Sequence, residues 1–316
     1  MIRVAVVQAG SVYGDCARTL ERLRRLVERA ADEGARLAVF PEAFLGGYPK
    51  GLTFDAPVGR RTEAGRLEYL RYSGAAVGLR GPEMAQVADL ASRTGVFLVV
   101  GMVERSGGTL YCTAAMVDPG RGLVGHHRKL MPTAAERLVW GFGDGSTIGV
   151  VDSPAGRVGA AICWENYMPM LRQAMYAQGV DVYCAPTVDD REVWQHTMRH
   201  IALEGRCFVL SACQFACRED YPTDYRTTIE PDADGAVIRG GSVIVGPLGE
   251  ILAGPEYGRE CLLVADVDLD RRIAGHFDLD VAGHYARPDV FQLLVDDRPK
   301  RSVSFASSTD DAAGDG

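Results

Sequence analysis

The fold of this chain is decided by residues 159–172, Gly159-Ala160-Ala161-Ile162-Cys163-Trp164-Glu165-Asn166-Tyr167-Met168-Pro169-Met170-Leu171-Arg172. The first part reads as an apolar strand that ends at Cys163, and the second part as a helix with apolar residues at helical spacing. Cys163 is therefore expected at a strand-to-helix elbow, where unpaired N–H groups carry partial positive charge and favour a thiolate. This position suits a nucleophile, although an isolated cysteine in an apolar strand is more often simply buried.

The composition excludes several classes of protein. The chain has 316 residues, of which 47% are hydrophobic and 24% are charged, and its formal net charge is −8. A sizeable apolar core is expected, and the acidic balance argues against a nucleic-acid-binding surface or a polybasic membrane surface. The first strand is too short and too early for a signal peptide, and no apolar run approaches the ~20 residues that span a bilayer. We expect a cytoplasmic protein that binds small molecules or copies of itself, with no nucleic acid and no membrane.

Metals and cofactors are not expected either. The eight cysteines read as free thiols in the absence of a secretory signal. Cys213 and Cys217 have no further ligands at zinc-binding spacing. The chain also lacks the glycine-rich motifs that bind dinucleotides or the phosphates of nucleotides.

Alternating elements predict an α/β fold. A strand at residues 2–9, an amphipathic helix at about 16–33 and a strand at 36–40 form a β-α-β start, which indicates parallel pairing. Later glycine-containing turns indicate antiparallel hairpins, so the sheet is expected to be mixed. Residues 51–80 are less patterned and are expected to form an insertion over a site or at a subunit contact. Further helices are expected at about 81–94, 163–178 and 192–204, and further strands at 96–103, 110–117, 123–127, 148–151, 158–162, 180–185, 208–212, 242–245, 250–253 and 262–267.

Strands enough for two sheets, with helices outside them, predict a layered α/β sandwich in one domain at residues 1–300. Residues 301–316 are rich in Ser, Ala and Asp and are expected to form a disordered tail.

Two further charged residues follow apolar strands, as Cys163 does. Glu42 comes directly after Val39-Phe40-Pro41, and a carboxylate in such surroundings should have a raised pKa and accept protons near neutrality. Lys129 follows the strand that ends at Arg128, and beside a cysteine its ammonium would lower the thiol pKa and stabilise negative charge on a substrate. Each residue alone is also compatible with the surface end of a strand.

Two more glutamates have open roles. Glu136 lies seven residues after Lys129 and would hold the lysine, act as a second carboxylate, or favour the dipole at a helix start. Glu165, two residues after Cys163, is as consistent with capping the elbow helix as with taking part in a reaction.

These residues resemble the Glu, Lys and Cys motifs of the nitrilase family. Cys163-Trp164-Glu165 followed by Pro169 is typical of true nitrilases within the carbon–nitrogen hydrolase superfamily, and Tyr111-Cys112-Thr113 resembles the plant-type group, which includes cyanoalanine-hydrolysing members. Tyr167 and Ala38 depart from the usual pattern, which puts the choice of substrate in doubt and not the reaction. The resemblance covers about residues 4–294, and its segments are 41–49, 127–137, 140–146, 163–166, 199–205, 240–242 and 283–289.

The resemblance implies a four-layer αββα sandwich with mixed sheets, no cofactor, and hydrolysis of an organic nitrile to the carboxylic acid and ammonia. Cys163 would form the thioimidate and thioester, Glu42 would activate water, Lys129 would stabilise developing charge, and Glu136 would orient the lysine. Alternatives are an amidase of the same superfamily, a cyanide-degrading nitrilase, and a catalytically silent filament or scaffold protein.

Two expectations concern binding. Tyr48, Trp164 and Trp194 lie in or beside the motif-bearing segments, and we expect them to line a substrate pocket that favours aryl, arylalkyl or cyanoalanine-like nitriles over cyanide. The resemblance also implies homodimers that stack into spirals, with the elbow helix at residues 166–178 as an apolar pairing face.

Overall fold

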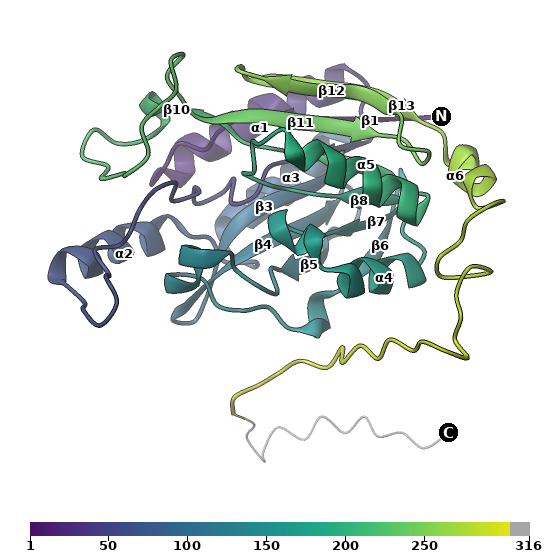
Figure 1. Ribbon diagram of the computed structural model, residues 1–316. Coiled ribbons are helices and arrows are strands. Elements are labelled where there is room, and N and C mark those ends of the chain that lie inside the picture. Colours follow the sequence, from purple (N-terminus) through teal and green to yellow (C-terminus); the bar gives the residue numbers. More distant parts are fainter. Residues whose placement is uncertain (304–316) are drawn as a thin grey trace.

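The computed structural model describes residues 1–303, so residues 304–316 of the expected disordered tail lie outside the described residues. Two mixed β-sheets form the centre of the molecule (Figure 1). The strand order is β13-β1-β2-β3-β4-β5 in one sheet and β10-β11-β9-β8-β7-β6 in the other, where β12 pairs with β11. The strands are β1 (Ile2–Gln8), β2 (Leu37–Val39), β3 (Phe97–Ser106), β4 (Thr109–Asp118), β5 (Gly122–Arg128), β6 (Val150–Ser153), β7 (Gly156–Ala160), β8 (Val182–Cys184), β9 (Phe208–Ser211), β10 (Phe215–Cys217), β11 (Ala236–Val245), β12 (Ile251–Tyr257) and β13 (Cys261–Val267).

Parallel pairing is confined to the middle of each sheet. β2 pairs in parallel with β1 and β3, and β8 pairs in parallel with β7 and β9. The outer pairs are antiparallel, including the two hairpins β3–β4 and β4–β5. The expected mixture of parallel and antiparallel strands is therefore confirmed.

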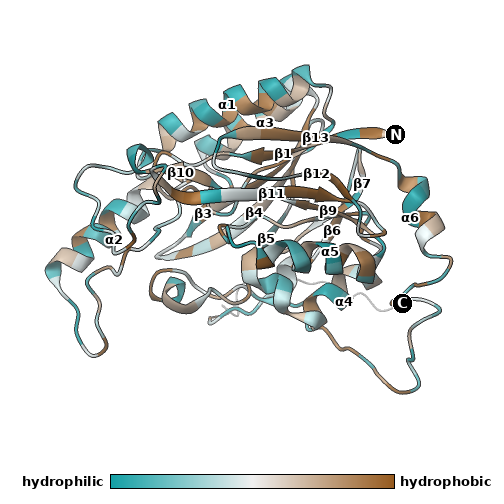
Figure 2. Ribbon diagram, turned by 45° about the horizontal axis from the view of Figure 1, so that its top comes forward, coloured by the Kyte–Doolittle hydropathy of each residue, from teal (hydrophilic) through white to brown (hydrophobic). Residues whose placement is uncertain are grey.

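Six helices surround the sheets within residues 1–303, and four of them cover the outer faces. They are α1 (Cys16–Asp32), α2 (Glu63–Ala75), α3 (Pro82–Thr94), α4 (Pro169–Ala177), α5 (Val193–Gly205) and α6 (Leu269–Gly275), with short 3₁₀ turns η1 (Ala134–Leu138), η2 (Gly145–Thr147), η3 (Cys163–Tyr167) and η4 (Arg218–Asp220). Figure 2 shows α1 and α3 on one side of the strands and α4 and α5 on the opposite side. The buried residues of α1 and α3 form one apolar cluster with the first sheet, and those of α4 and α5 form another with the second sheet. A third cluster fills the space between the sheets, so the αββα sandwich is confirmed.

Local signals explain where the covering helices begin and end. The Asp15 side chain accepts a hydrogen bond from the Arg18 N–H group at the start of α1, as an N-cap does. Pro82 opens α3, and Gly95 closes it with a left-handed φ of +71°, which glycine adopts without steric cost. None of the helices within residues 1–303 is both long and apolar enough to cross a membrane.

Three details differ from the sequence-based expectation. The less patterned segment contains α2, whose exposed Leu67 and Leu70 obscure any apolar face. The helix after Cys163 does not start at the cysteine, because a 3₁₀ turn precedes α4 and Pro169 occupies its first turn. The apolar pairing face expected on residues 166–178 is wrong for Leu171 and Met175, which are buried within the chain's own core.

Candidate active site

The expected catalytic residues meet at one end of the sandwich. Glu42 follows β2, Lys129 follows β5 and Cys163 follows β7. Because the first two strands belong to one sheet and β7 to the other, the site lies where the two sheets face each other. All three side chains are buried, with exposed fractions of 0%, 1% and 4% for Glu42, Lys129 and Cys163.

Lys129 is held between two carboxylates. Its Nζ donates hydrogen bonds of 2.7 Å to Glu42 Oε1 and to Glu136 Oε2. Burial alone would lower the pKa of Lys129, but Glu42, Cys163 and Glu136 together raise it well above its usual value. The lysine is therefore an ammonium group at neutral pH, fixed in direction by two charge-assisted hydrogen bonds.

Glu136 takes its position from two further donors. The Thr133 N–H group donates to Glu136 Oε2 at 2.6 Å, and the Tyr48 hydroxyl donates to Glu136 Oε1 at 2.8 Å. Both oxygens of this carboxylate are thus engaged by the protein. The geometry suits a residue that orients Lys129, one of the roles considered from the sequence.

The two oxygens of Glu42 differ. Oε1 accepts the bond from Lys129 and a contact of 3.5 Å from the Cys112 thiol, whereas buried Oε2 has no hydrogen-bond partner among the described residues. Burial raises the pKa of Glu42; Lys129 opposes this rise and Glu136 adds to it. Oε2 is the oxygen left to take a proton from the thiol or from water.

Cys163 has a strained backbone. Its φ of +51° lies in the left-handed region, which costs a non-glycine residue about 1–3 kcal/mol. Its N–H group donates to the Pro186 carbonyl at 2.8 Å, and the Thr187 hydroxyl donates to Sγ at 3.1 Å. These contacts hold the thiol at the elbow, beside Glu42 and Lys129.

The protonation of Cys163 differs from the expectation. Burial raises the pKa of the Cys163 thiol, and Glu42 raises it further, while Lys129 lowers it without reversing the change. These shifts favour the neutral thiol over the thiolate at Cys163. Cys163 therefore needs a base, and the unpartnered oxygen of Glu42 is in position to serve as one.

Glu165 joins the loops that carry Lys129 and Cys163. Its carboxylate accepts bonds from the backbone N–H groups of Leu130 and Ile162 at 2.5 and 2.8 Å, and lies 3.0 Å from His127 Nε2. Both oxygens of the Glu165 carboxylate thus contact groups of the surrounding scaffold. Of the two roles left open by the sequence, the geometry supports the structural one.

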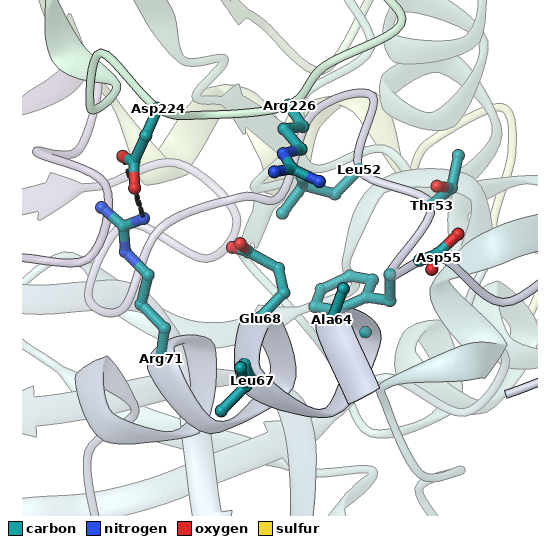
Figure 3. A pocket seen from close by; sticks show the side chains of 11 residues that line it. Leu52, Thr53, Asp55, Ala64, Leu67, Glu68, Arg71, Asp224 and Arg226 are labelled. Atoms are coloured by element: carbon teal, nitrogen blue, oxygen red, sulfur yellow. Dashed lines mark hydrogen bonds and ion pairs between the residues drawn. The ribbon is translucent and has the colours of Figure 1, made fainter. Parts of the chain in front are cut away.

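A cavity of about 200 Å³ opens onto Cys163. Its lining is more polar than expected, because charged side chains outnumber aromatic ones. The lining residues are Tyr48, Lys50, Thr133, Glu136, Cys163, Trp164, Val188, Asp189, Asp190 and Arg191. Figure 3 shows a larger cavity, of about 490 Å³, between α2 and residues 224–226; none of the expected catalytic residues lines it.

The three expected substrate-binding aromatics do not share one place. Tyr48 and Trp164 line the cavity, and the Trp164 indole N–H group donates to Asp189 Oδ2 at 2.9 Å. Trp194 is fully buried on α5, where its indole N–H group donates to Ser211 Oγ at 2.9 Å. Trp194 thus belongs to the core beneath α5, and its expected place in the pocket is corrected.

Several residues of the site have no clear signal in the local sequence. Cys112 lies in the resembling segment Tyr111-Cys112-Thr113, and Thr187 follows β8. Nothing in the local sequence indicates the contact of Cys112 with Glu42 or that of Thr187 with Cys163, which depend on how distant strands pair. Lys50 directly follows the resembling segment at residues 41–49. The available sequence signal for Lys50 is its position at the end of the glycine- and proline-rich loop that follows Glu42.

Comparison with known proteins identifies the family. The carbon–nitrogen hydrolase family matches residues 3–276. The chain is 57% identical to a nitrilase of Bradyrhizobium diazoefficiens, with 97% of this chain and 95% of that protein covered. It is 55% identical to an aliphatic nitrilase of Sinorhizobium fredii (95% and 97% covered) and 51% identical to a bifunctional nitrilase/nitrile hydratase of Nicotiana tabacum (98% and 90% covered).

Solved structures support the same fold at lower sequence identity. The NitFhit protein of C. elegans aligns with a TM-score of 0.73 and 19% identity, covering 95% of this chain and 68% of that one. An amidase from Nesterenkonia sp. aligns with a TM-score of 0.64 and 20% identity, covering 86% and 92%. With the family match and the nitrilases above, the chain belongs to the carbon–nitrogen hydrolase family, on its nitrilase branch.

Proposed function

We propose that this protein hydrolyses an organic nitrile, with two water molecules, to a carboxylic acid and ammonia. The observation that carries the proposal is the buried group of Cys163, Glu42, Lys129 and Glu136, in which a lysine joins two carboxylates at 2.7 Å beside a thiol. The similarity to nitrilases at 51–57% identity supports the same reaction.

The residues divide the chemistry as follows. Glu42 accepts the Cys163 proton as Sγ adds to the nitrile carbon, the proton passes to the nitrile nitrogen, and Lys129 stabilises the charge that develops there. Water adds its hydroxyl group to the thioimidate carbon while Glu42 takes the proton and passes it to the nitrogen. The hydroxyl proton of the tetrahedral intermediate then also reaches the nitrogen through Glu42, the C–N bond breaks, and ammonia leaves the thioester. A second water then releases the acid from the thioester.

An amidase is the second candidate, because amide hydrolysis uses the same thioester. A relative named a bifunctional nitrilase/nitrile hydratase also raises the question of amide release. Assaying a nitrile and its matching amide, with ammonia, acid and amide all quantified, separates these activities. A nitrile turned over to acid faster than its amide is expected; turnover of the amide alone would contradict the proposal.

Variants test the assigned roles. Cys163→Ala is expected to abolish turnover, and Glu42→Gln and Lys129→Ala are each expected to slow it by about 10²–10⁴. Cys207→Ala, which removes a buried thiol from the cluster under α5, is the control and should stay near wild type. A covalent adduct in intact-protein mass spectra of the wild type quenched during turnover, absent in Cys163→Ala, would support the thioimidate route. Activity in Cys163→Ala would contradict it.

The remaining features are also proposals. We propose aryl, arylalkyl or cyanoalanine-like nitriles as the substrate range, with Tyr48 and Trp164 as the aromatic surfaces of the cavity. Cyanide hydrolysis is the alternative, and kcat/KM for phenylacetonitrile, cyanoalanine and cyanide decides between them. We also propose that the protein is cytoplasmic and forms a homo-oligomer.

A further inference from the structure

Lys50 is the charged residue of the Cys163 cavity that has no charged partner. Among the described residues, its ammonium group makes neither a hydrogen bond nor an ion pair, although it lines the same cavity as Cys163. The other charged groups there are matched. Glu136 bonds to Lys129, and Asp189 bonds to Arg191 Nε at 2.7 Å.

Asp190 is matched as well. Its Oδ2 accepts a bond of 3.0 Å from the Arg239 N–H group and lies 3.7 Å from Arg239 Nε. Asp189 and Asp190 each lie next to an arginine, and Glu136 shares Lys129 with Glu42, so Lys50 is the basic group of the cavity lining that has no acidic partner among the described residues.

The backbone of Lys50 is fixed, which limits where its side chain can reach. The Lys50 carbonyl accepts hydrogen bonds from the Tyr225 hydroxyl at 2.9 Å and from the Thr227 hydroxyl at 3.1 Å. Its N–H group donates to the Tyr48 carbonyl at 2.9 Å. These three hydrogen bonds fix the Lys50 backbone in the cavity lining.

The charge of Lys50 acts on the interior. Burial raises the pKa of the Cys213 thiol, Asp190 and Cys163 raise it further, and Lys50 opposes the rise. Cys213 is fully buried, and Lys50, Asp190 and Cys163, whose charges influence it, all line one cavity. The chain also has only three lysines among its 34 basic residues, namely Lys50, Lys129 and Lys300. Lysine, with its compact point charge, is thus a rare choice in this chain.

We propose that Lys50 is a specificity-determining residue that binds a carboxylate on the substrate, so that nitriles carrying an anionic group are preferred over neutral ones of the same shape. This inference rests on the proposed nitrile hydrolysis. The cavity of about 200 Å³ holds roughly seven water-sized groups. A carboxylate at Lys50 and a nitrile carbon at Cys163 therefore belong to one short molecule.

The test compares 3-cyanopropanoate with 4-methylpentanenitrile, in which an isopropyl group replaces the carboxylate and the number of non-hydrogen atoms is unchanged. Wild-type kcat/KM is expected to be at least about tenfold higher for the anion, as for a hydrogen bond to a charged group. Lys50→Met, which keeps the length of the side chain, should remove most of this preference by raising KM for the anion. Lys50→Arg keeps the charge and should retain more of the preference than Lys50→Met.

Two controls make the result specific. Lys300→Met removes an exposed lysine that pairs with Asp296 and should leave the ratio of the two kcat/KM values unchanged. In the wild type, added salt should raise KM for 3-cyanopropanoate and not for 4-methylpentanenitrile, because salt screens the pair. This measurement also serves if Lys50→Met does not fold.

Failure of this inference and failure of the proposed reaction are distinguishable. If the wild type hydrolyses 4-methylpentanenitrile as well as 3-cyanopropanoate, or if Lys50→Met keeps the preference, the role of Lys50 is overturned and nitrile hydrolysis stands. If neither these nitriles nor phenylacetonitrile releases ammonia, the proposed function itself fails.

Discussion

At the scale of single residues, the two oxygens of the Glu42 carboxylate have different surroundings. Oε1 is bound by Lys129 at 2.7 Å and contacted by Cys112 Sγ at 3.5 Å, and Oε2 is left without a partner among the described residues. Burial raises the pKa of Glu42 above its usual 4.5. A base must be ionised to act, so kcat/KM of the wild type should fall as pH drops through a value above 4.5.

Removing the Cys112 thiol should shift the pH at which kcat/KM falls on the acid side of the profile, here called the acid limb. The S–H group donates to the carboxylate and favours its charged form, so Cys112→Ala should raise the pKa of Glu42 and shift the limb to higher pH. The pH profile of kcat/KM measures the shift. Cys207→Ala removes a buried thiol that does not touch Glu42 and should leave the profile in place. An unchanged profile in Cys112→Ala, with normal folding, would show that the thiol only fills space.

The buried pair of His127 and Glu165 should make stability depend on pH. Burial lowers the pKa of His127, but Glu165 raises it more, so the folded value lies above the usual 6.5. A raised pKa stabilises the fold below 6.5, and this contribution is lost as pH rises through the folded value. The Tm difference between wild type and His127→Gln should therefore shrink as pH rises above 6.5. Glu165→Ala should cost about 3–5 kcal/mol of unfolding free energy, because it leaves a buried partner unpaired. A constant Tm difference would mean that the pKa of His127 is the same in the folded and unfolded chains.

At the scale of elements, β3 determines where Glu42 can sit. A Cβ atom on Gly101 would lie 2.0 Å from the Pro41 carbonyl oxygen and 2.8 Å from Glu42 Cα. Gly101→Ala should therefore push the Pro41–Glu42 backbone outward and move the carboxylate from Lys129. We expect at least a hundredfold loss of kcat, on the order of the cost of misplacing a catalytic group by 1 Å. Gly108→Ala, in the β3–β4 turn with open space around it, is the control; equal effects of the two changes would argue against this close approach.

The sequence predicts best those helices whose apolar spacing reflects packing of one face against one sheet. α1 and α3 each bury one face against the first sheet, so caps and apolar spacing place both almost to the residue. α2 has no such apolar face, and because its leucines are exposed, apolar spacing does not reveal this helix in the sequence.

The site follows the same rule. Glu42, Lys129 and Cys163 follow apolar strands, which is a local signal, and the structure brings all three together. Trp194 could not be placed from local sequence, because its burial beneath α5 depends on Ser211 of β9. The contact of Cys112 with Glu42 joins β4 to the loop after β2, and only the sheet order reveals it.

At the scale of the whole molecule, the chain after α6 leaves apolar side chains uncovered. Figure 1 shows this segment descending from α6 and then crossing below the sandwich, where the Lys300 N–H group donates to Asp144 Oδ2 at 2.8 Å. Phe291 and Leu294 are 79% and 94% exposed on it, whereas Met170 is the most exposed apolar side chain of α4, at 71%. Exposed apolar side chains in a row mark contacts with other chains, which moves the expected subunit contact from the elbow helix to this C-terminal segment.

Light scattering after size exclusion tests this assignment. The wild type is expected to have a mass of at least twice the 34.1 kDa of one chain. A double change, Phe291→Asp with Leu294→Asp, should lower the mass because it buries two charges in an apolar contact. Met170→Asp on α4 is the comparison, since it adds one negative charge at the most exposed apolar side chain of the helix that the sequence favoured. A fall in mass with Met170→Asp alone would return the contact to α4, and a monomeric wild type at working concentration would remove the homo-oligomer altogether.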